Sequence, residues 1–101
     1  MFETIVSKNQ IPIRLTDERW AHITDEHSEL AGMRYEVLET VVNPQKIVEG
    51  KAGEHLAIRE IEAGKYLVVV YKEIKKDGFI ITAFQTKRTK SLLKRKILWP
   101  T

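Results

Sequence analysis

The stretch from residue 46 to residue 86 constrains the fold most, because its apolar residues recur with a period of two. This alternation is typical of half-buried β-strands, and it predicts four of them: residues 46–49, 55–62, 66–74 and 79–86. Each of the three connections is short and contains glycine, which supplies the positive φ that hairpin turns require. Three short connections in succession predict an antiparallel β-meander.

Two helices are predicted ahead of this meander, after a short strand over residues 11–15. Thr16 is suited to cap the first helix, which is predicted over residues 17–27 with an apolar stripe of Trp20, Ile23, His27 and Leu30. The second helix is predicted over residues 35–42. Helices grouped before an antiparallel sheet define an α+β domain. We therefore expect the N-terminal strand and both helices to pack on one face of the meander.

The length of 101 residues suits one domain over residues 1–101. We expect its folded core over about residues 11–88, followed by a basic C-terminal segment over residues 87–101. Residues 1–86 carry 11 basic and 14 acidic side chains. The basic C-terminal segment has no acidic side chain and six basic ones: Lys87, Arg88, Lys90, Lys94, Arg95 and Lys96. Such a block can attract phosphates or an acidic protein.

The basic C-terminal segment also contains apolar residues at helix-like spacing, namely Leu92, Leu93, Ile97, Leu98 and Trp99. This pattern predicts a short basic amphipathic helix that docks on the domain, with Pro100 ending it. The alternative interpretation is a solvated tail, since chain ends are often poorly ordered.

Several classes of protein and site are excluded by what the sequence lacks. Without cysteine, the chain has no disulfide framework, thiolate zinc site or cysteine nucleophile. Its longest apolar run, residues 66–71, has the length of a strand and is too short for a membrane helix. Residues 1–4 lack the basic and apolar pattern of a signal peptide, so a cytoplasmic protein is expected. No glycine-rich phosphate loop or nucleophile elbow is present, and we expect no cofactor.

Alternation along the strands separates their side chains into two predicted faces. One set is apolar and suited to packing under the helices: Leu56, Ile58, Leu67, Val69, Tyr71, Phe79, Ile81 and Ala83. The other set mixes aliphatic residues with cations, hydroxyls and an aromatic ring: Ala57, Arg59, Ile61, Val68, Val70, Lys72, Ile80, Thr82, Phe84 and Thr86. This mixed face is suited to a polar, anionic ligand, although an ordinary solvent-facing side of a sheet carries the same residue types.

The histidines are candidates for proton transfer, since an imidazole titrates near neutral pH. His22 and His27 lie five residues apart, about 140° around a helix, so they do not share one face. His27 lies within the apolar stripe, whereas His22 lies on its flank and His55 begins a strand. Asp25 and Glu26 lie close to both helical histidines. The H-x4-H spacing does not direct two ligands at one ion, and no metal site is expected.

Six segments resemble the motifs of a known group of proteins: Arg14–Ile23, His27–Leu30, Val37–Pro44, Ala57–Glu60, Tyr66–Lys72 and Phe79–Thr86. The group comprises small bacterial and phage proteins of the barnase–EndoU–colicin–RelE-like nuclease superfamily. Their pattern is a W-x-H-I helix, followed by H-P-E-L and then by V-L-x-T-V-x-N-P. The resemblance covers about residues 13–88, and Ser28 stands in the place of the usual proline.

The resemblance implies helices on one side of an antiparallel sheet whose open face receives RNA. It also implies cleavage without metal, by attack of the ribose 2′-hydroxyl on the adjacent phosphodiester. In this chain it implies His22 as general acid or base and Arg59 as phosphate clamp. The other implied contacts are hydrogen bonds from Thr82 and Thr86, charge from Lys72, support from His27, and a phosphate track over the cations from Lys87 to Lys96.

A small toxic nuclease of this kind would need control by a cognate inhibitor protein. An acidic antitoxin would contact the basic C-terminal segment or the open face of the sheet. Two other classes of function stay open. The first is a non-catalytic module that binds RNA or a protein through Lys94–Lys96. The second is a structural relic of a nuclease that forms a homodimer through Trp99 and its apolar neighbours.

Overall fold

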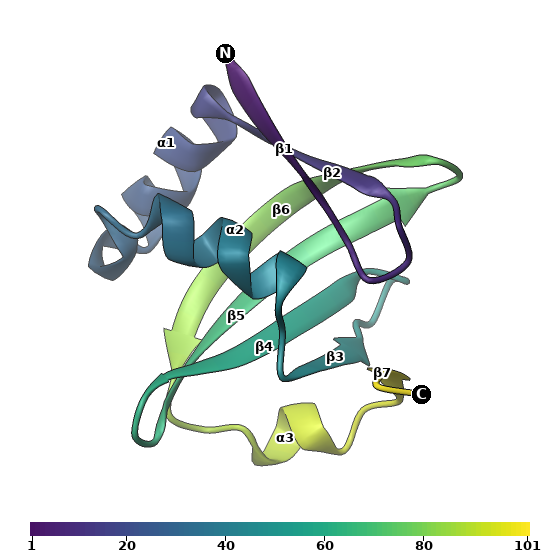
Figure 1. Cartoon of the computed structure of the whole chain (residues 1–101). Coiled ribbons are helices and arrows are strands. Elements are labelled where there is room, and N and C mark those ends of the chain that lie inside the picture. The colour runs from purple at the N-terminus through teal and green to yellow at the C-terminus, as the bar shows by residue number, and fades with distance from the viewer.

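The computed structural model describes all residues from Met1 to Thr101 and has an α+β fold (Figure 1). Its elements are β1 (Phe2–Val6), β2 (Pro12–Thr16), α1 (Asp17–Glu26), the 3-10 turn η1 (Ser28–Leu30), α2 (Arg34–Val42), β3 (Lys46–Glu49), β4 (His55–Glu62), β5 (Lys65–Ile74), β6 (Asp77–Thr86), α3 (Lys90–Leu93) and β7 (Ile97–Trp99). The seven strands form one sheet in the order β1-β2-β6-β5-β4-β3-β7. None of its helices is long and apolar enough to cross a membrane.

The predicted meander is confirmed, because β3, β4, β5 and β6 pair successively and antiparallel. β3 and β4 have the predicted bounds. β5 begins one residue earlier than predicted, at Lys65, and β6 begins two residues earlier, at Asp77. These three additional residues pair with Glu62, Ile74 and Glu73, so the ladders extend up to the hairpin turns.

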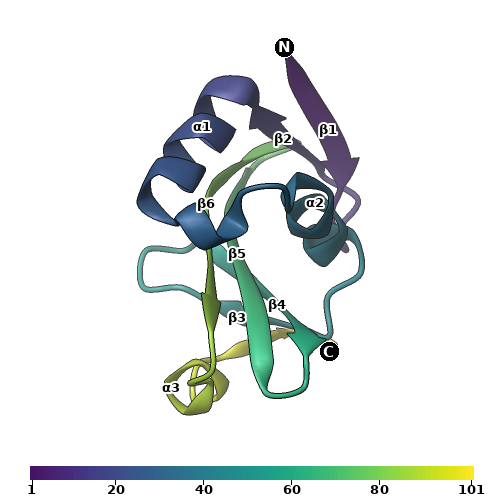
Figure 2. The ribbon, with the colours of Figure 1, turned by 90° about the vertical axis from the view of Figure 1, so that its left-hand side faces the viewer.

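Both predicted helices are confirmed, and they lie on one side of the sheet, which we call the front face (Figure 1 and Figure 2). The Thr16 hydroxyl accepts a 3.0 Å hydrogen bond from the Arg19 N–H and caps α1 as predicted. The helix ends at Glu26, one residue early, because His27 takes up an extended φ of −130°. The buried front core gathers residues from β2, both helices and the sheet, among them Leu15, Ile23, Val41, Leu67 and Tyr71.

Of the hairpin formed by β1 and β2, only the second strand was predicted. β1 pairs antiparallel with β2, and β2 pairs parallel with β6, so the hairpin extends the sheet past the meander. The predicted packing of the N-terminal strand on a face of the meander is therefore wrong, because the strand satisfies its backbone groups by pairing with the edge of β6. Arg34 on α2 connects these elements. Its Nη2 lies 2.9 Å from Asp17 Oδ1 on α1, and its Nε lies 2.6 Å from Glu3 Oε1 on β1. The Nε contact is an ion pair without hydrogen-bond geometry.

Asp17→Asn is expected to lower the free energy of unfolding at neutral pH and to make that free energy vary less as the pH falls. The hydrogen bond from Arg34 lowers the pKa of Asp17 below its ordinary value of 3.8. A pKa that is lower in the folded state stabilises the fold above the unfolded pKa, and this stabilisation is lost as pH falls through the folded pKa. Urea unfolding from pH 7 down to pH 2 should show the two proteins converging below about pH 4. A constant difference at every pH would contradict this expectation.

The basic C-terminal segment differs from both of its predicted forms. It contains one helical turn, α3, and its last apolar residues form strand β7 on the edge of β3. The predicted short docked helix is therefore confirmed only over Lys90–Leu93, whereas its extension through Ile97, Leu98 and Trp99 is wrong, and so is the solvated tail. The free edge of β3 presents unpaired N–H and C=O groups, and strand pairing satisfies them where a helix would not. Leu92, only 8% exposed, packs against Val48, Leu56, Ile58 and Val68.

Leu92→Ala is expected to lower the free energy of unfolding by about 2 kcal/mol, since it empties the apolar contact that holds the segment on the sheet. Leu93→Ala is a matched control, because the adjacent Leu93 is 48% exposed. Urea unfolding compares the two variants with the native chain. An equal loss of stability in both would show that Leu92 is not the anchor.

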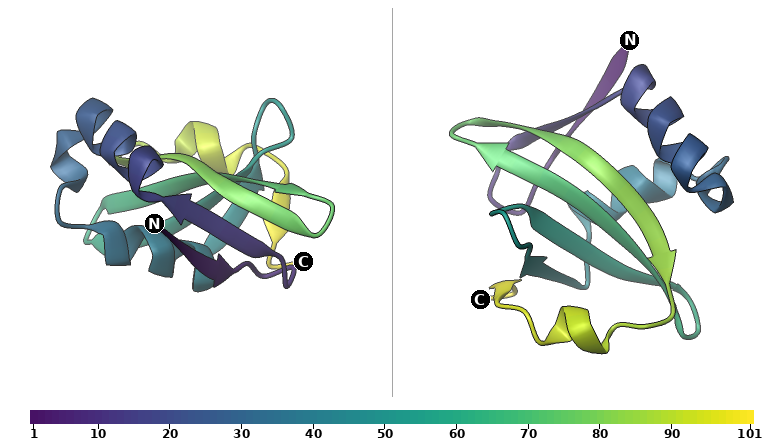
Figure 3. Two further views of the ribbon diagram at one scale, coloured as in Figure 1. Left: turned by 90° about the horizontal axis from the view of Figure 1, so that it is seen from above. Right: turned by 180° about the vertical axis from the view of Figure 1, so that it is seen from behind.

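On the other side of the sheet, the back face, the short helix α3 packs through Leu92 against β3, β4 and β5, and no helix lies over β6 (Figure 3, right). The predicted assignment of faces is wrong for β4. Cross-strand pairs share a face, and Ala57 pairs with Val69 in the front core, whereas Ile58 pairs with Val68 in the back cluster. Alternation divides the side chains of one strand between two faces. The register between strands must also be known before the face of one strand can be matched with the face of the next.

A bulge in β6 alters the predicted faces a second time. Val70 pairs with Thr82 while its neighbour Tyr71 pairs with Ile80, so Ile81 is an extra residue in the ladder. Ile80 therefore lies in the front core and Phe79 on the back face, the reverse of the prediction.

Candidate functional site

The predicted site residues on the strands do not share one face. Lys72 pairs with Phe79 and Thr82 pairs with Val70, which places both on the back face. Arg59 pairs with Leu67 of the front core, so its predicted position beside Lys72 and Thr82 is wrong. The cause is the register of β4 against β5, which strand alternation alone does not give.

His22 lies on the solvent side of α1. Its imidazole is 60% exposed, and Nε2 lies 2.6 Å from Glu26 Oε1, one helical turn further along. It lines a hollow of about 270 Å³ together with Thr16, Glu18 and Arg19, which we call the His22 hollow. No strand of the meander contributes to this hollow, so the structure does not bring His22 together with Arg59, Thr82 or Thr86.

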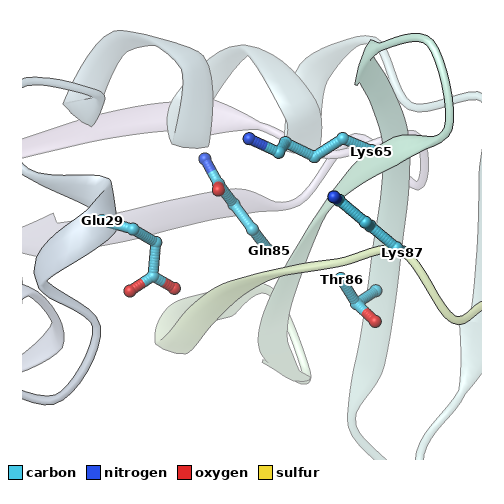
Figure 4. Close-up of a pocket in the computed structure, with 5 residues that line it drawn as sticks. All are labelled: Glu29, Lys65, Gln85, Thr86 and Lys87. Carbon is cyan, nitrogen blue, oxygen red and sulfur yellow. The ribbon is translucent and has the colours of Figure 1, made fainter.

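A second hollow, which we call the polar pocket, lies at the end of β6 and has a volume of about 290 Å³. Its lining contains no hydrophobic residue and comes from η1, the start of β5, the end of β6 and the chain beyond: Glu29, Lys65, Gln85, Thr86 and Lys87. Figure 4 shows two ammonium groups, an amide and a carboxylate in this lining. Segments distant in the sequence thus gather two cations around one polar space.

Local structure explains how these side chains are held. The neighbour of Glu29, Leu30, is fully buried in the front core and anchors η1. The Gln85 amide donates a 3.3 Å hydrogen bond to Met33 Sδ ahead of α2. Thr86 Oγ1 accepts a 3.0 Å hydrogen bond from the Arg88 N–H, which shapes the turn on which Lys87 lies. The Thr86 hydroxyl therefore has a structural partner within the chain.

His27 adjoins the polar pocket through Glu29. Its imidazole is 32% exposed, and Nδ1 lies 3.7 Å from Glu29 Oε2. The ring centroid is 6.2 Å from that of Phe84 on β6, at an interplanar angle of 38°. His27 is half-buried, as its place in the apolar stripe predicts, and an acidic partner connects it to the pocket.

The arrangement combines two kinds of chemistry. Lys65 and Lys87 present positive charge to an anion, and the Gln85 amide offers neutral hydrogen-bond donors beside them. The carboxylate of Glu29 and the imidazole of His27 can accept and release protons. Such a site can bind a phosphate group and move a proton at one of its ester oxygens.

Sequence reasoning did not select Glu29, Lys65 or Gln85 as site residues. Glu29 stands in the segment that resembles H-P-E-L, two residues after His27, and that motif is the signal that could have indicated it. Lys65 belongs to a hairpin connection in the sequence-based prediction, and Gln85 lies on the opposite face from Thr86, so neither spacing nor alternation groups them.

His55 is buried away from the polar pocket. Its imidazole is 17% exposed, Nε2 lies 3.5 Å from Glu73 Oε1, and the ring stacks on Tyr71 at 5.1 Å between centroids. Glu73 also accepts hydrogen bonds from Ser7 and Asn9 in the β1–β2 loop. Burial, followed by the charge of Glu73, raises the pKa of Tyr71. This cluster secures the β1–β2 loop against the sheet.

The six cations of the basic C-terminal segment lie on and around helix α3, in a segment that is docked on the sheet. None of the six makes an ion pair within 4.0 Å, and of these only Lys87 lines the polar pocket. No group of three or more histidine and acidic side chains is arranged to hold a metal ion.

Comparison with known proteins yields no relative. No protein-family model matches the chain, and searches for similar curated proteins and for similar solved structures find no match.

Proposed function

We propose that this protein is a metal-independent ribonuclease whose reacting phosphodiester binds in the polar pocket. The observation that carries the proposal is the pairing of two ammonium groups, Lys65 and Lys87, with the His27–Glu29 pair 3.7 Å apart. The resemblance to the barnase–EndoU–colicin–RelE-like superfamily supports the same chemistry. The proposal also takes the RelE-like form of the α+β fold as its framework.

The reaction requires two proton transfers. A base removes the proton of the ribose 2′-hydroxyl, the 2′-oxygen attacks phosphorus, and the bond from phosphorus to the 5′-oxygen breaks. An acid then protonates the leaving 5′-oxygen, and the products carry a 2′,3′-cyclic phosphate and a 5′-hydroxyl. We assign the two proton transfers to His27 and Glu29. Lys65 and Lys87 stabilise the negative charge that accumulates on the phosphate oxygens.

In this proposal Arg59 remains a ligand of an RNA phosphate, which it contacts from the front face of the sheet. It pairs with Leu67, which pairs with Gln85 of the polar pocket, so two strand spacings of about 10 Å in total separate Arg59 from Gln85. Its guanidinium forms no ion pair within the chain. A long, unpaired arginine side chain at this distance can reach an RNA phosphate next to the pocket.

The activity is tested by incubating the native chain with labelled single-stranded RNA in EDTA. We expect cleavage that persists in the chelator and rises with protein concentration. Arg59→Gln should cleave more slowly than the native chain while retaining its urea midpoint. RNA that stays intact under all buffer conditions would overturn the proposal.

The second candidate is a non-catalytic module that binds RNA through the basic C-terminal segment. The observation that favours it is the absence of ion pairs around the segment's six cations, which leaves their charge available. Replacing Lys94, Arg95 and Lys96 by glutamine should abolish binding if the module is the whole function, and should leave cleavage of a dinucleotide intact if the protein is a nuclease. An acidic inhibitor protein is the partner that we propose for the same cations.

A further inference from the structure

A third hollow lies at the start of β6, and the proposed reaction does not use it. It has a volume of about 330 Å³ and is lined by Arg14, Thr16, Arg19, Phe79 and Ile80. We call it the Phe79 hollow. It shares Thr16 and Arg19 with the His22 hollow, so the two hollows adjoin along the flank of α1.

Of the two arginines that line the Phe79 hollow, one is paired with a carboxylate and the other is not. Arg14 Nη2 lies 2.6 Å from Asp77 Oδ2, and its guanidinium carbon lies 5.7 Å from the Phe2 ring centroid. Arg19 is exposed and has no carboxylate within 4.0 Å, although its neighbour Glu18 lines the adjoining His22 hollow. The guanidinium of Arg19 is therefore the group available to an anion from solvent.

The same hollow contains an aromatic ring that the core does not use. Phe79 is 42% exposed on the back face, opposite Lys72 on β5. An exposed ring beside an unpaired guanidinium fits a nucleotide, because the base can stack on the ring while the phosphate contacts the cation.

We infer that the Phe79 hollow is a second nucleotide subsite for single-stranded RNA, with Arg19 on a phosphate and Phe79 under a base. The inference rests on the proposed function for the identity of the polymer. It gives the RNA a second point of attachment, away from the bond that is cleaved.

β6 connects this subsite to the polar pocket. Gln85 lies six positions after Phe79, which corresponds to about 20 Å along a strand. Between the two hollows, Thr82 and Phe84 lie on the back face of β6, where no helix covers the strand (Figure 3, right). An RNA strand laid along the back of β6 passes Thr82 and Phe84 and meets the polar pocket at Thr86, the lining residue on that face, and it has to turn round the end of β6 to reach Gln85 on the front face.

The test measures binding of a twelve-nucleotide RNA that carries 2′-O-methyl groups throughout, which the native chain is unable to cleave by 2′-hydroxyl attack. Arg19→Gln and Phe79→Leu are each expected to weaken its binding about tenfold, as the loss of one stacked base or phosphate contact implies. Phe79→Tyr keeps an aromatic surface and should bind like the native chain. Lys51→Gln, in the exposed loop before β4, and Ile74→Ala, exposed at the end of β5, are controls for charge and for apolar surface.

A 2′-O-methyl dinucleotide separates the subsite from the reacting site. It fills only the polar pocket, so Arg19→Gln and Phe79→Leu should bind it as the native chain does. Native affinity of both variants for the long RNA would overturn the inference, and so would an equal loss with the dinucleotide or the absence of any binding. If the native chain cleaves no RNA but both variants lose affinity for the long RNA alone, the ribonuclease proposal fails and the subsite stands.

Discussion

Replacing His27 by alanine is expected to lower the rate of RNA cleavage by about a hundredfold to ten-thousandfold, the range that a positioned acid or base contributes. The imidazole lies 3.7 Å from Glu29 at the rim of the polar pocket, and no other histidine adjoins that pocket. The measurement is the initial rate of cleavage of a dinucleotide in EDTA. The urea midpoint of the variant reports whether it has kept its fold.

His22→Ala is the matched comparison for this prediction. His22 lies on the same helix, but its Nε2 contacts Glu26 and its hollow contains no residue of the polar pocket. We therefore expect it to cleave a dinucleotide within about twofold of the native rate. The opposite ranking, with His22 essential and His27 dispensable, would move the reacting phosphate to the flank of α1.

The second large effect is expected at the two lysines of the polar pocket. Lys87→Gln and Lys65→Gln should each lower the rate about a hundredfold, because each removes a positive charge that stabilises the developing phosphate anion. Both substitutions keep a side chain of similar length and retain hydrogen-bond donors. Lys65 also lies 3.9 Å from Glu62, an exposed contact that contributes little to stability.

Lys51→Gln serves as the control for lost positive charge, because Lys51 is exposed in the loop between β3 and β4. Rates measured across a range of salt distinguish a contact with the reacting phosphate from general attraction of RNA. A loss that disappears at high salt, or that Lys51→Gln reproduces, would contradict the assignment of the two lysines.

The meander was predictable because its signals are local. The alternation of apolar residues and the glycines at positive φ, Gly53 at 83° and Gly64 at 76°, are properties of short segments. The third turn is different, since Lys75 takes the positive φ of 58°. Gly78 is needed there for space, because a Cβ would lie 2.5 Å from the backbone oxygen of Lys72 on β5 and 2.5 Å from Ile13 Cδ1 on β2. The first contact comes from the neighbouring strand of the hairpin, and the second from a strand more than sixty residues away.

The elements that escaped prediction depend on distant partners. β1 lies on the edge of the sheet and is joined to the helices by the contacts of Arg34, while β7 forms because β3 has a free edge. Neither strand has an alternating pattern of its own that is long enough to indicate it. The wrong face of Arg59 has the same origin, because cross-strand register is a property of two segments together.

The candidate site was predictable only in part, for a related reason. Helical periodicity identified His27 as half-buried and His22 as accessible, and accessibility favoured His22 as the reacting group. The structure shows that a half-buried histidine can adjoin a pocket when its partner, Glu29, reaches the surface. The pocket is lined by Lys65 and Lys87 from separate segments, and no spacing within the sequence joins these two residues.

We propose that the chain cleaves RNA by attack of a 2′-hydroxyl, and the mass of the fragments reports this chemistry. The substrates are a twelve-nucleotide RNA in EDTA and the same RNA with a single 2′-O-methyl group at the cleaved position. We expect fragments ending in a 2′,3′-cyclic phosphate and a 5′-hydroxyl, and no cleavage at the methylated position. Fragments with a 3′-hydroxyl and a 5′-phosphate, or cleavage that ignores the methyl group, would contradict the proposal.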